Sequence, residues 1–285
     1  MRKILGLFVA FLFLAGMVLF TGPDILLRRS INSLLRASER KRRRTEVAWQ
    51  LAWARRYWWM VERVLHMGFD LRVPDLTWRG HYIVVLNHRN VLDHLVAAQV
   101  FREVGVEDPR WIVKAQMRSA PIVGESLARA GFAFVSRSKD PEDIDRIRQM
   151  ARVARADRVS VALYPEGTRF DGKPKSDTRY TAVGEPKIGG FAALCEELPE
   201  YRVLVVCIDW GDLPDARTIW DGSAYVDRDV RVSVWEERNP SRAGAQAFLV
   251  NVWDQMEHRL SESRGRSLAL KMQARAIERV RNGQA

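Results

Sequence analysis

The segment Asn87-His88-Arg89-Asn90-Val91-Leu92-Asp93-His94 follows the apolar run 82–86 and has residues suited to proton transfer. A histidine can take a proton from a hydroxyl near neutral pH, and an aspartate can orient its ring and stabilise the imidazolium. Five residues is not same-face helix spacing. It brings the side chains together if His88 lies in a turn and Asp93 in the first turn of a following helix. The alternative is an ordinary polar strand-to-helix turn.

Arginines follow two further apolar runs. Arg137 comes after 132–135, and Arg169 ends the YPEGTR segment that follows 159–163. A guanidinium group binds phosphate through two parallel hydrogen bonds. The chemistry indicated by the combination is proton removal next to a bound anion.

Neighbouring residues have more than one possible use. Glu166 can bind an arginine or an acceptor hydroxyl, and Gly167 can serve a tight turn or a close ligand approach. Lys114, Thr168 and Lys187 are candidates for phosphate contacts, with a surface lysine as the alternative for Lys114 and a helix-start charge for Lys187. His94 beside Asp93 raises the possibility of a metal triad with His88. Since no carboxylate or cysteine cluster supports it, we expect no metal.

The elements that position these residues alternate along the chain from about residue 69. Short apolar runs predict strands at 81–86, 110–114, 132–136, 159–164, 202–208 and 229–235. Longer amphipathic runs predict helices at 92–104, about 117–130, 141–156, 187–198 and 241–262, with a basic helix from 264. This alternation predicts an α/β fold with a mainly parallel, mixed sheet flanked by helices. Ligands bind such sheets at the carboxyl ends of the strands.

The chain begins with an apolar segment, residues 4–20, that contains no charged residue. Seventeen residues of helix rise about 26 Å, at the short end of what spans a bilayer. A cleaved signal peptide is the alternative. The length of the run and the lack of a clear cleavage site favour an uncleaved membrane anchor.

Eight basic residues follow within two dozen positions, including the ERKRRR cluster at 39–44. The excess of basic residues after the anchor predicts that the body of the protein faces the cytoplasm, at a membrane we expect to be the inner membrane. The cluster can attract anionic headgroups or nucleic acid; its position after an apolar anchor favours headgroups and no nucleic acid. Residues 45–67 predict an amphipathic helix lying on the membrane or on the domain.

The composition is that of a globular protein: 285 residues, 47% hydrophobic and 28% charged, with a net charge of +11. Two cysteines give neither a disulfide framework nor a zinc signature. We divide the chain into an anchor (1–30), a basic juxtamembrane region (31–68), a catalytic domain (69–240) and C-terminal helices (241–285). The basic charge suggests an anionic partner.

Three of these segments resemble the conserved blocks of the glycerolipid acyltransferases, the 1-acyl-glycerol-3-phosphate (lysophosphatidate) acyltransferase family. NHRNVLDH resembles the NHxxxxD (HX4D) block. Residues 113–116, Pro121, Gly124 and 131–137 resemble the second block, and YPEGTR resembles the third. A lone HxxxxD would carry little weight, but three blocks in order, behind an apolar anchor, are specific. The resemblance covers roughly residues 70–210.

The resemblance implies the glycerolipid acyltransferase fold and an enzyme of phospholipid biosynthesis. His88 would be the base and Asp93 its orienting residue. Arg137, with Glu166, Gly167, Thr168, Arg169 and Lys114, would bind the acceptor phosphate. The donor would be acyl-CoA or acyl-ACP, with acyl carrier protein a possible partner. The acceptor would be a lysophospholipid, lysophosphatidic acid first, and no further cofactor is implied.

The fourth block departs from the family, because the strand 202–208 lacks the usual proline. The insert 170–184 and the segment 185–191 are closer to a branch that includes the endoplasmic-reticulum lysophospholipid acyltransferases. Both features leave other acceptors open, of the lysophosphatidylglycerol or lysophosphatidylinositol type. A different class of function, a basic membrane-tethering or nucleic-acid-binding protein with the α/β body as a scaffold, leaves the His–Asp segment unexplained.

Overall fold

The fold is built around one seven-stranded sheet. The computed structural model describes residues 2–136, 140–173, 178–211 and 224–281. The strand order is β1-β7-β6-β2-β5-β3-β4. The strands are β1 (Gly68–Arg72), β2 (Tyr82–Leu86), β3 (Arg110–Lys114), β4 (Ala133–Val135), β5 (Val161–Leu163), β6 (Arg202–Asp209) and β7 (Asp229–Arg238). Among the described strands every pairing is parallel except β6 with β7, so the prediction of a mainly parallel, mixed sheet is confirmed.

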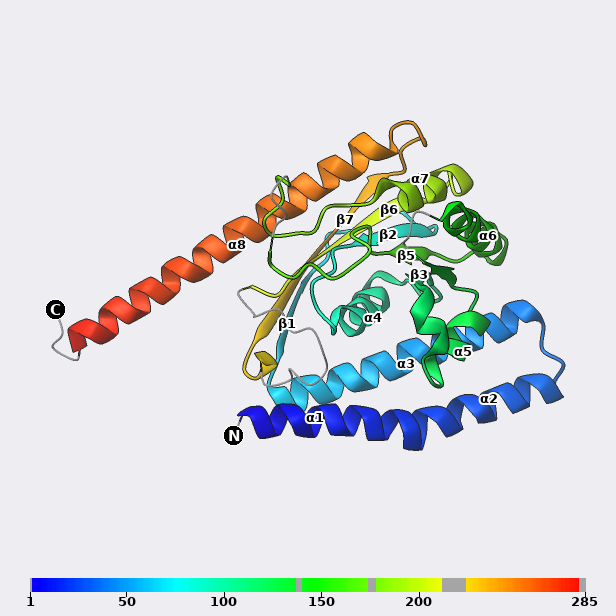
Figure 1. Cartoon of the computed structure of the whole chain (residues 1–285), viewed down its shortest axis with the longest axis horizontal. Coiled ribbons are helices and arrows are strands. Elements are labelled where there is room, and N and C mark those ends of the chain that lie inside the picture. Colours follow the sequence, from blue (N-terminus) through cyan, green and yellow to red (C-terminus); the bar gives the residue numbers. More distant parts are fainter. Residues whose placement is uncertain (1, 137–139, 174–177, 212–223, 282–285) are drawn as a thin grey trace.

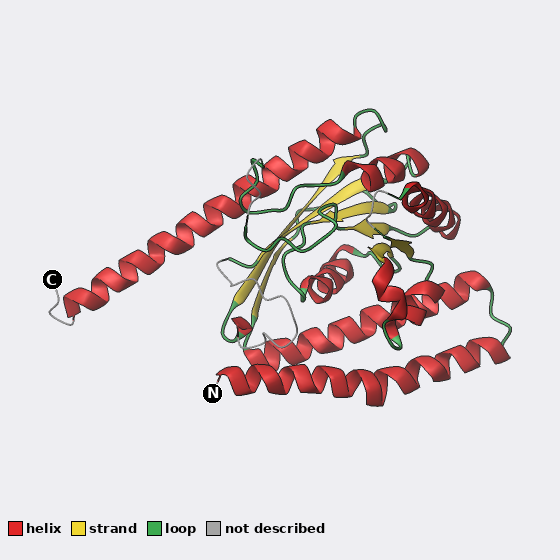
Figure 2. Cartoon of the chain, in the orientation of Figure 1, coloured by secondary structure: helices red, strands yellow, loops and turns green. Residues whose placement is uncertain are grey.

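Helices cover both faces of the sheet (Figures 1 and 2). One face carries α3 (Glu39–Leu65), α4 (Asp93–Val104) and α5 (Val123–Arg129). The other carries α6 (Pro141–Asp157), α7 (Ile188–Glu197) and the start of α8 (Ala245–Arg281), which extends well beyond the sheet. In β2, Val84 packs on the first face and Ile83 on the second. All five residues of β2 are therefore buried, as expected for a strand covered on both sides.

The six predicted strands are all present. The sequence analysis missed β1, a short edge strand whose burial alternates and whose sequence, GFDLR, gives only a weak strand signal. The single helix expected at about 117–130 was wrong: a 3₁₀ turn, η2 (Ala115–Ser119), and the short α5 occupy this stretch. Pro121 lies between them and has no N–H to donate, and Ile122 has a positive φ of 64°. The helices expected at 241–262 and from 264 form one helix, α8, through Arg281.

The N-terminal segment forms α1 (Arg2–Gly16), a π-helical turn, η1 (Met17–Thr21), and α2 (Gly22–Leu34) in succession. Together they lie along the outer side of α3 (Figure 1). The rings of Phe13 and Tyr57 are 4.4 Å apart, and Tyr57 donates a hydrogen bond to the Phe13 carbonyl at 3.2 Å. By length and composition Leu7–Leu34 is one helix able to cross a membrane, a test that an N-terminal signal sequence also passes.

A buried ion network joins α3 to the body. Arg43 on α3 donates to both carboxylate oxygens of Asp157 at the end of α6, at 2.8 and 3.1 Å. Asp157 also pairs at 3.4 Å with Arg110 of β3, whose side chain is fully buried. Arg110 in turn bonds the buried Asp108. Two arginines therefore share these two carboxylates; the Arg110 side chain is fully buried, whereas that of Arg43 is 20% exposed.

Replacing Asp157 with alanine should destabilise the protein strongly. Arg110 would keep its charge in a dry site with one carboxylate fewer, which typically costs about 3–5 kcal/mol. Urea unfolding in detergent micelles would measure the change. The control is Arg152→Ala, which breaks a two-bond pair with Glu197 on the exposed side of the same helix. An equal loss in both variants would contradict the special role of the buried network.

Candidate active site

The candidate site lies at the carboxyl edge of the sheet, where β2 ends. Asn87 follows β2, and its side-chain amide donates to the Ile208 carbonyl of β6 at 2.9 Å and accepts from the Ile208 N–H at 2.7 Å. Asn87 thereby extends the pairing of β2 with β6 by one residue, which fixes the point from which the next residues leave the sheet.

His88 and Asp93 form a hydrogen-bonded pair. Nδ1 of His88 lies 2.8 Å from Oδ2 of Asp93, the first residue of α4. The same oxygen accepts the backbone N–H groups of Arg89 and Asn90 at 2.8 and 2.7 Å. Because the carboxylate only accepts, the proton of the His88 ring lies on Nδ1, and Nε2 keeps a free lone pair. The predicted dyad geometry is therefore present, with a base whose orientation is fixed.

Two aromatic side chains, those of Trp210 and Tyr225, bond the loop between β2 and α4. Trp210, the residue after β6, donates its indole N–H to Oδ1 of Asp93 at 2.7 Å. Tyr225 donates its hydroxyl to the side-chain carbonyl of Asn90. The sequence analysis missed both. The available signal for Trp210 was its position directly after a buried strand that neighbours β2.

The YPEGTR turn holds the backbone of His88 from the other side. Oε1 of Glu166 accepts the His88 N–H at 3.0 Å, and the Phe170 N–H donates to the His88 carbonyl at 2.7 Å. Glu166 is 4% exposed. Burial raises the pKa of Glu166 well above its usual value, the Asp93 charge adds to the rise, and the His88 and Gly184 N–H groups oppose it. Its contact differs from those we expected, because Glu166 binds the backbone of the loop that carries His88.

Aromatic rings surround His88. Tyr164 stacks on His88 with ring centroids 4.2 Å apart and also stacks on Trp111 at 5.3 Å. The His94 ring meets the Tyr164 ring edge-on at 5.1 Å. His94 is exposed at the surface, and its packing against these rings and the nearby Arg169 guanidinium lower its pKa to about 4. Among the described residues, no group of three histidines, cysteines or carboxylates is placed to hold a metal ion.

Cationic and polar groups gather beside this pair at the end of β5. Gly167 has a positive φ of 71°, and a Cβ there would lie 3.2 Å from Nζ of Lys187, so a side chain at this position would be strained and crowded. Thr168 and Arg169 are exposed, as is Lys187. The backbone N–H of Lys187 bonds the Pro165 carbonyl at 2.8 Å, which holds the start of α7 against the turn.

Two further predicted residues belong to the next strands along this edge. Lys114 is exposed at the end of β3, which pairs with β5. Arg137 follows β4 but lies outside the described residues. The order β6-β2-β5-β3 therefore brings Trp210, His88, Arg169 and Lys114 to one edge of the sheet.

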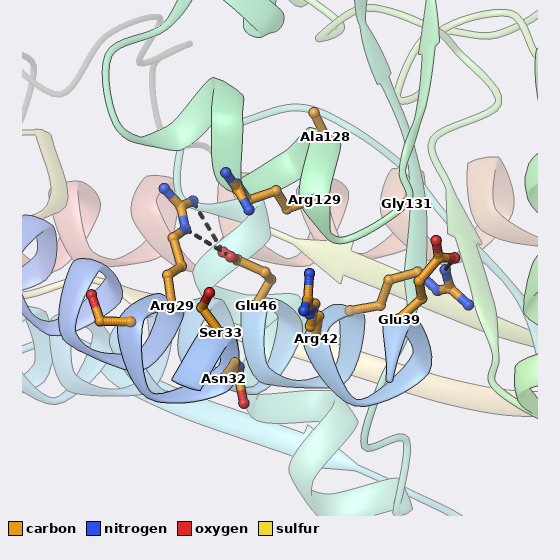
Figure 3. A pocket seen from close by; sticks show the side chains of 11 residues that line it. Arg29, Asn32, Ser33, Glu39, Arg42, Glu46, Ala128, Arg129 and Gly131 are labelled. Carbon is orange, nitrogen blue, oxygen red and sulfur yellow. Dashed lines mark hydrogen bonds and ion pairs between the residues drawn. The ribbon is translucent and has the colours of Figure 1, made fainter. Parts of the chain in front are cut away.

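A separate cavity of about 480 Å³ lies between α2, α3 and α5 (Figure 3). Arg29, Arg42, Arg43 and Arg129 line it together with Glu39 and Glu46. Its charges are largely paired internally, since Arg29 binds Glu46 at 2.8 and 3.2 Å and also reaches Glu125. None of the predicted site residues lines this cavity, so it is distinct from the candidate active site.

Comparison with known proteins agrees with this geometry. Residues 70–208 match the family described as Acyltransferase. A 1-acyl-sn-glycerol-3-phosphate acyltransferase of Saccharomyces cerevisiae is 28% identical over 109 residues, which cover 37% of this chain and 34% of the relative. A second enzyme of that name, from Arabidopsis thaliana, is 24% identical over 169 residues, which cover 55% and 44%. Residues 70–208, just under half of the chain, therefore carry an acyltransferase-family domain.

A solved structure shares the fold over most of the chain. The crystal structure of the 1-acyl-sn-glycerophosphate (LPA) acyltransferase PlsC from Thermotoga maritima matches with a TM-score of 0.60 and 20% identity, covering 92% of this chain and 97% of that one. The predicted α/β acyltransferase fold is confirmed. The chain spans less than half the length of the curated yeast and plant relatives it matches.

The buried Glu166 predicts how the stability of the protein depends on pH. The pKa of Glu166 is raised in the folded protein. Above about pH 4.3 the folded protein therefore keeps a proton on this carboxyl that the unfolded chain releases. The free energy of unfolding of the wild type, relative to Glu166→Gln, should then fall by about 1.4 kcal/mol per pH unit above that pH, until the folded-state pKa is reached.

Urea unfolding in detergent micelles between pH 5 and pH 8 measures this difference. Glu103→Gln, at an exposed position on α4, is the control and should run parallel to the wild type. If wild type and Glu166→Gln also run parallel, the carboxyl is not held in its protonated form.

Proposed function

We propose that the chain moves a fatty acyl group from an acyl thioester, acyl-CoA or acyl-ACP, to the free hydroxyl of a lysophospholipid. Lysophosphatidic acid, giving phosphatidic acid, is the acceptor we favour. The observation that supports this most directly is the His88–Asp93 pair at 2.8 Å on the same sheet edge as the exposed Arg169 and Lys187. Proton removal and anion binding are the two tasks this reaction requires.

In the proposed reaction Nε2 of His88 takes the proton of the acceptor hydroxyl as its oxygen attacks the thioester carbonyl. Asp93 keeps the ring in the required tautomer and stabilises the imidazolium that forms. When the tetrahedral intermediate collapses, the C–S bond breaks and His88 returns its proton to the leaving sulfur. The free thiol and the ester are the products. Both cysteines, Cys195 and Cys207, are buried in the core and so cannot carry the acyl group; the transfer we propose is direct, without an acyl-enzyme.

The acceptor phosphate would lie at the turn after β5. Arg169 and Thr168 are exposed there, and Lys187 lies over Gly167, whose lack of a side chain leaves room for a close approach. Lys114 and Arg137 would add cationic groups from the two following strands. A phosphate monoester carries more charge than a diester, so this group of cations favours lysophosphatidic acid over lysophospholipids with a larger headgroup.

The N-terminal helices would hold the site at a membrane, where the lipid substrate resides. Large apolar side chains on α1 and α2 are exposed, among them Phe8, Phe11, Leu27 and Leu34. Such a surface is unfavourable in water and suits contact with lipid. Basic residues of the 39–44 cluster, at the start of α3, would meet anionic headgroups at the cytoplasmic side of the inner membrane.

Removing either member of the His–Asp pair should abolish most acyl transfer. His88→Ala deletes the base, and Asp93→Asn places an amide N–H against the Nδ1 proton or the loop N–H groups. Either change should lower kcat by about 10²–10⁴-fold. Membranes containing equal amounts of each variant would be assayed with labelled acyl-CoA and lysophosphatidate. His258→Ala, on the exposed part of α8, serves as the control. If His88→Ala retains a tenth or more of the wild-type rate, His88 is not the base.

Replacing Arg169 should weaken acceptor binding more than chemistry. Loss of one charge-assisted bond to phosphate should raise KM for lysophosphatidate about tenfold or more in Arg169→Gln, with a smaller rise for lysophosphatidylglycerol and lysophosphatidylinositol. Arg148→Gln, on α6 and paired with Glu196, is the matched control. Equal effects on all three acceptors would argue against recognition of the monoester phosphate.

A further inference from the structure

Trp210, which follows β6, and Tyr225, which precedes β7, each bond a side chain of the loop 88–93. We infer that Trp210, with Tyr225, is a positioning residue that keeps Asp93 and the loop 88–93 in the reactive geometry. Trp210 donates to Oδ1 of Asp93 at 2.7 Å, and Tyr225 donates to the side chain of Asn90. The role in catalysis rests on the proposed acyl transfer. The two contacts, which we call the clamp of Trp210 and Tyr225, can be tested without it.

The two oxygens of Asp93 have unequal surroundings. Oδ2 accepts three hydrogen bonds, from the His88 ring and two backbone N–H groups. Among the described residues, Trp210 alone donates to Oδ1. Asp93 is fully buried, so loss of this bond leaves a charged oxygen without a partner. The carboxylate would then rotate or admit water, and either change moves the oxygen that orients His88.

Tyr225 supports the same loop at a second point. The side-chain carbonyl of Asn90 accepts the Leu92 N–H at 3.1 Å in addition to the Tyr225 hydroxyl. The Trp210 and Tyr225 rings meet edge-on, with centroids 5.9 Å apart. The two donors therefore form one packed unit, and each supports a different residue of the turn between β2 and α4.

Packing alone does not account for the indole of Trp210. Trp58 on α3 is as deeply buried, with both side chains 2% exposed, yet Nε1 of Trp58 has no hydrogen-bond partner among the described residues. Replacement of either residue by phenylalanine removes similar buried area. Only the change at Trp210 removes a donor from Asp93, so the pair separates the loss of packing from the loss of the hydrogen bond.

The first experiment measures kcat and KM for Trp210→Phe and Trp58→Phe in full-length protein with lysophosphatidate and acyl-CoA. Trp210→Phe should lose about 10- to 100-fold in kcat with KM within twofold, because the bond acts on the base and not on the substrate. Trp58→Phe should keep both kcat and KM.

The second experiment does not require activity. Protein labelled with ¹⁵N-histidine in detergent micelles should show a low-field signal from the Nδ1 proton of His88, assigned by its loss in His88→Ala. The signal should broaden beyond detection in Trp210→Phe and persist in Trp58→Phe. Tyr225→Phe removes only a hydroxyl; it should lose roughly fivefold in kcat and broaden the same signal, and it tests the clamp even if Trp210→Phe does not fold.

The inference is overturned if Trp210→Phe loses less than tenfold in kcat relative to Trp58→Phe, or if its loss is in KM. A sharp Nδ1 signal in both Trp210→Phe and Tyr225→Phe also overturns it. If the wild type transfers no acyl group to any lysophospholipid, the proposed function fails. The histidine signal then still decides whether Trp210 holds the His–Asp pair.

Discussion

The buried carboxylate of Asp93 is the group on which the arrangement of the site depends. It accepts four N–H groups, from the His88 ring, two backbone amides and the Trp210 indole. A buried charge is tolerated only when its hydrogen-bonding capacity is filled. Each donor is thereby held at a fixed distance from one point. The conformation of the turn between β2 and α4 follows from this requirement, and so does the direction in which His88 presents Nε2.

Parallel strands supply these donors from different parts of the sequence. β6, β2 and β5 lie side by side, and the residues after them meet at one edge: Trp210, His88 and the YPEGTR turn. Glu166 of this turn accepts the His88 N–H, and Phe170, directly after the turn, donates its N–H to the His88 carbonyl. The Asn87 side chain bonds the backbone of Ile208 and so links the end of β2 to β6. The histidine is consequently held by Asp93 of its own loop and by residues that follow the neighbouring strands.

The remainder of the molecule supports this edge at a distance. The Arg43–Asp157–Arg110 network ties α3, and with it α1 and α2, to the opposite side of the catalytic body. The exposed apolar side chains of α1 and α2 lie on this attached layer. Under the proposed function, this link would keep the site at a constant height relative to the membrane that carries the acceptor.

The sequence by itself determined the α/β class, six of the seven strands and the pairing of His88 with Asp93, because apolar periodicity and motif order are local properties. It also predicted Arg169 and Lys187 as candidate anion-binding residues. Only the tertiary structure decided that Glu166 binds the His88 backbone, that Asn87 joins two strands, and that Trp210 and Tyr225 reach the catalytic loop. These contacts join residues 78 to 135 positions apart. Their partners are set by strand order and burial, which no local pattern encodes.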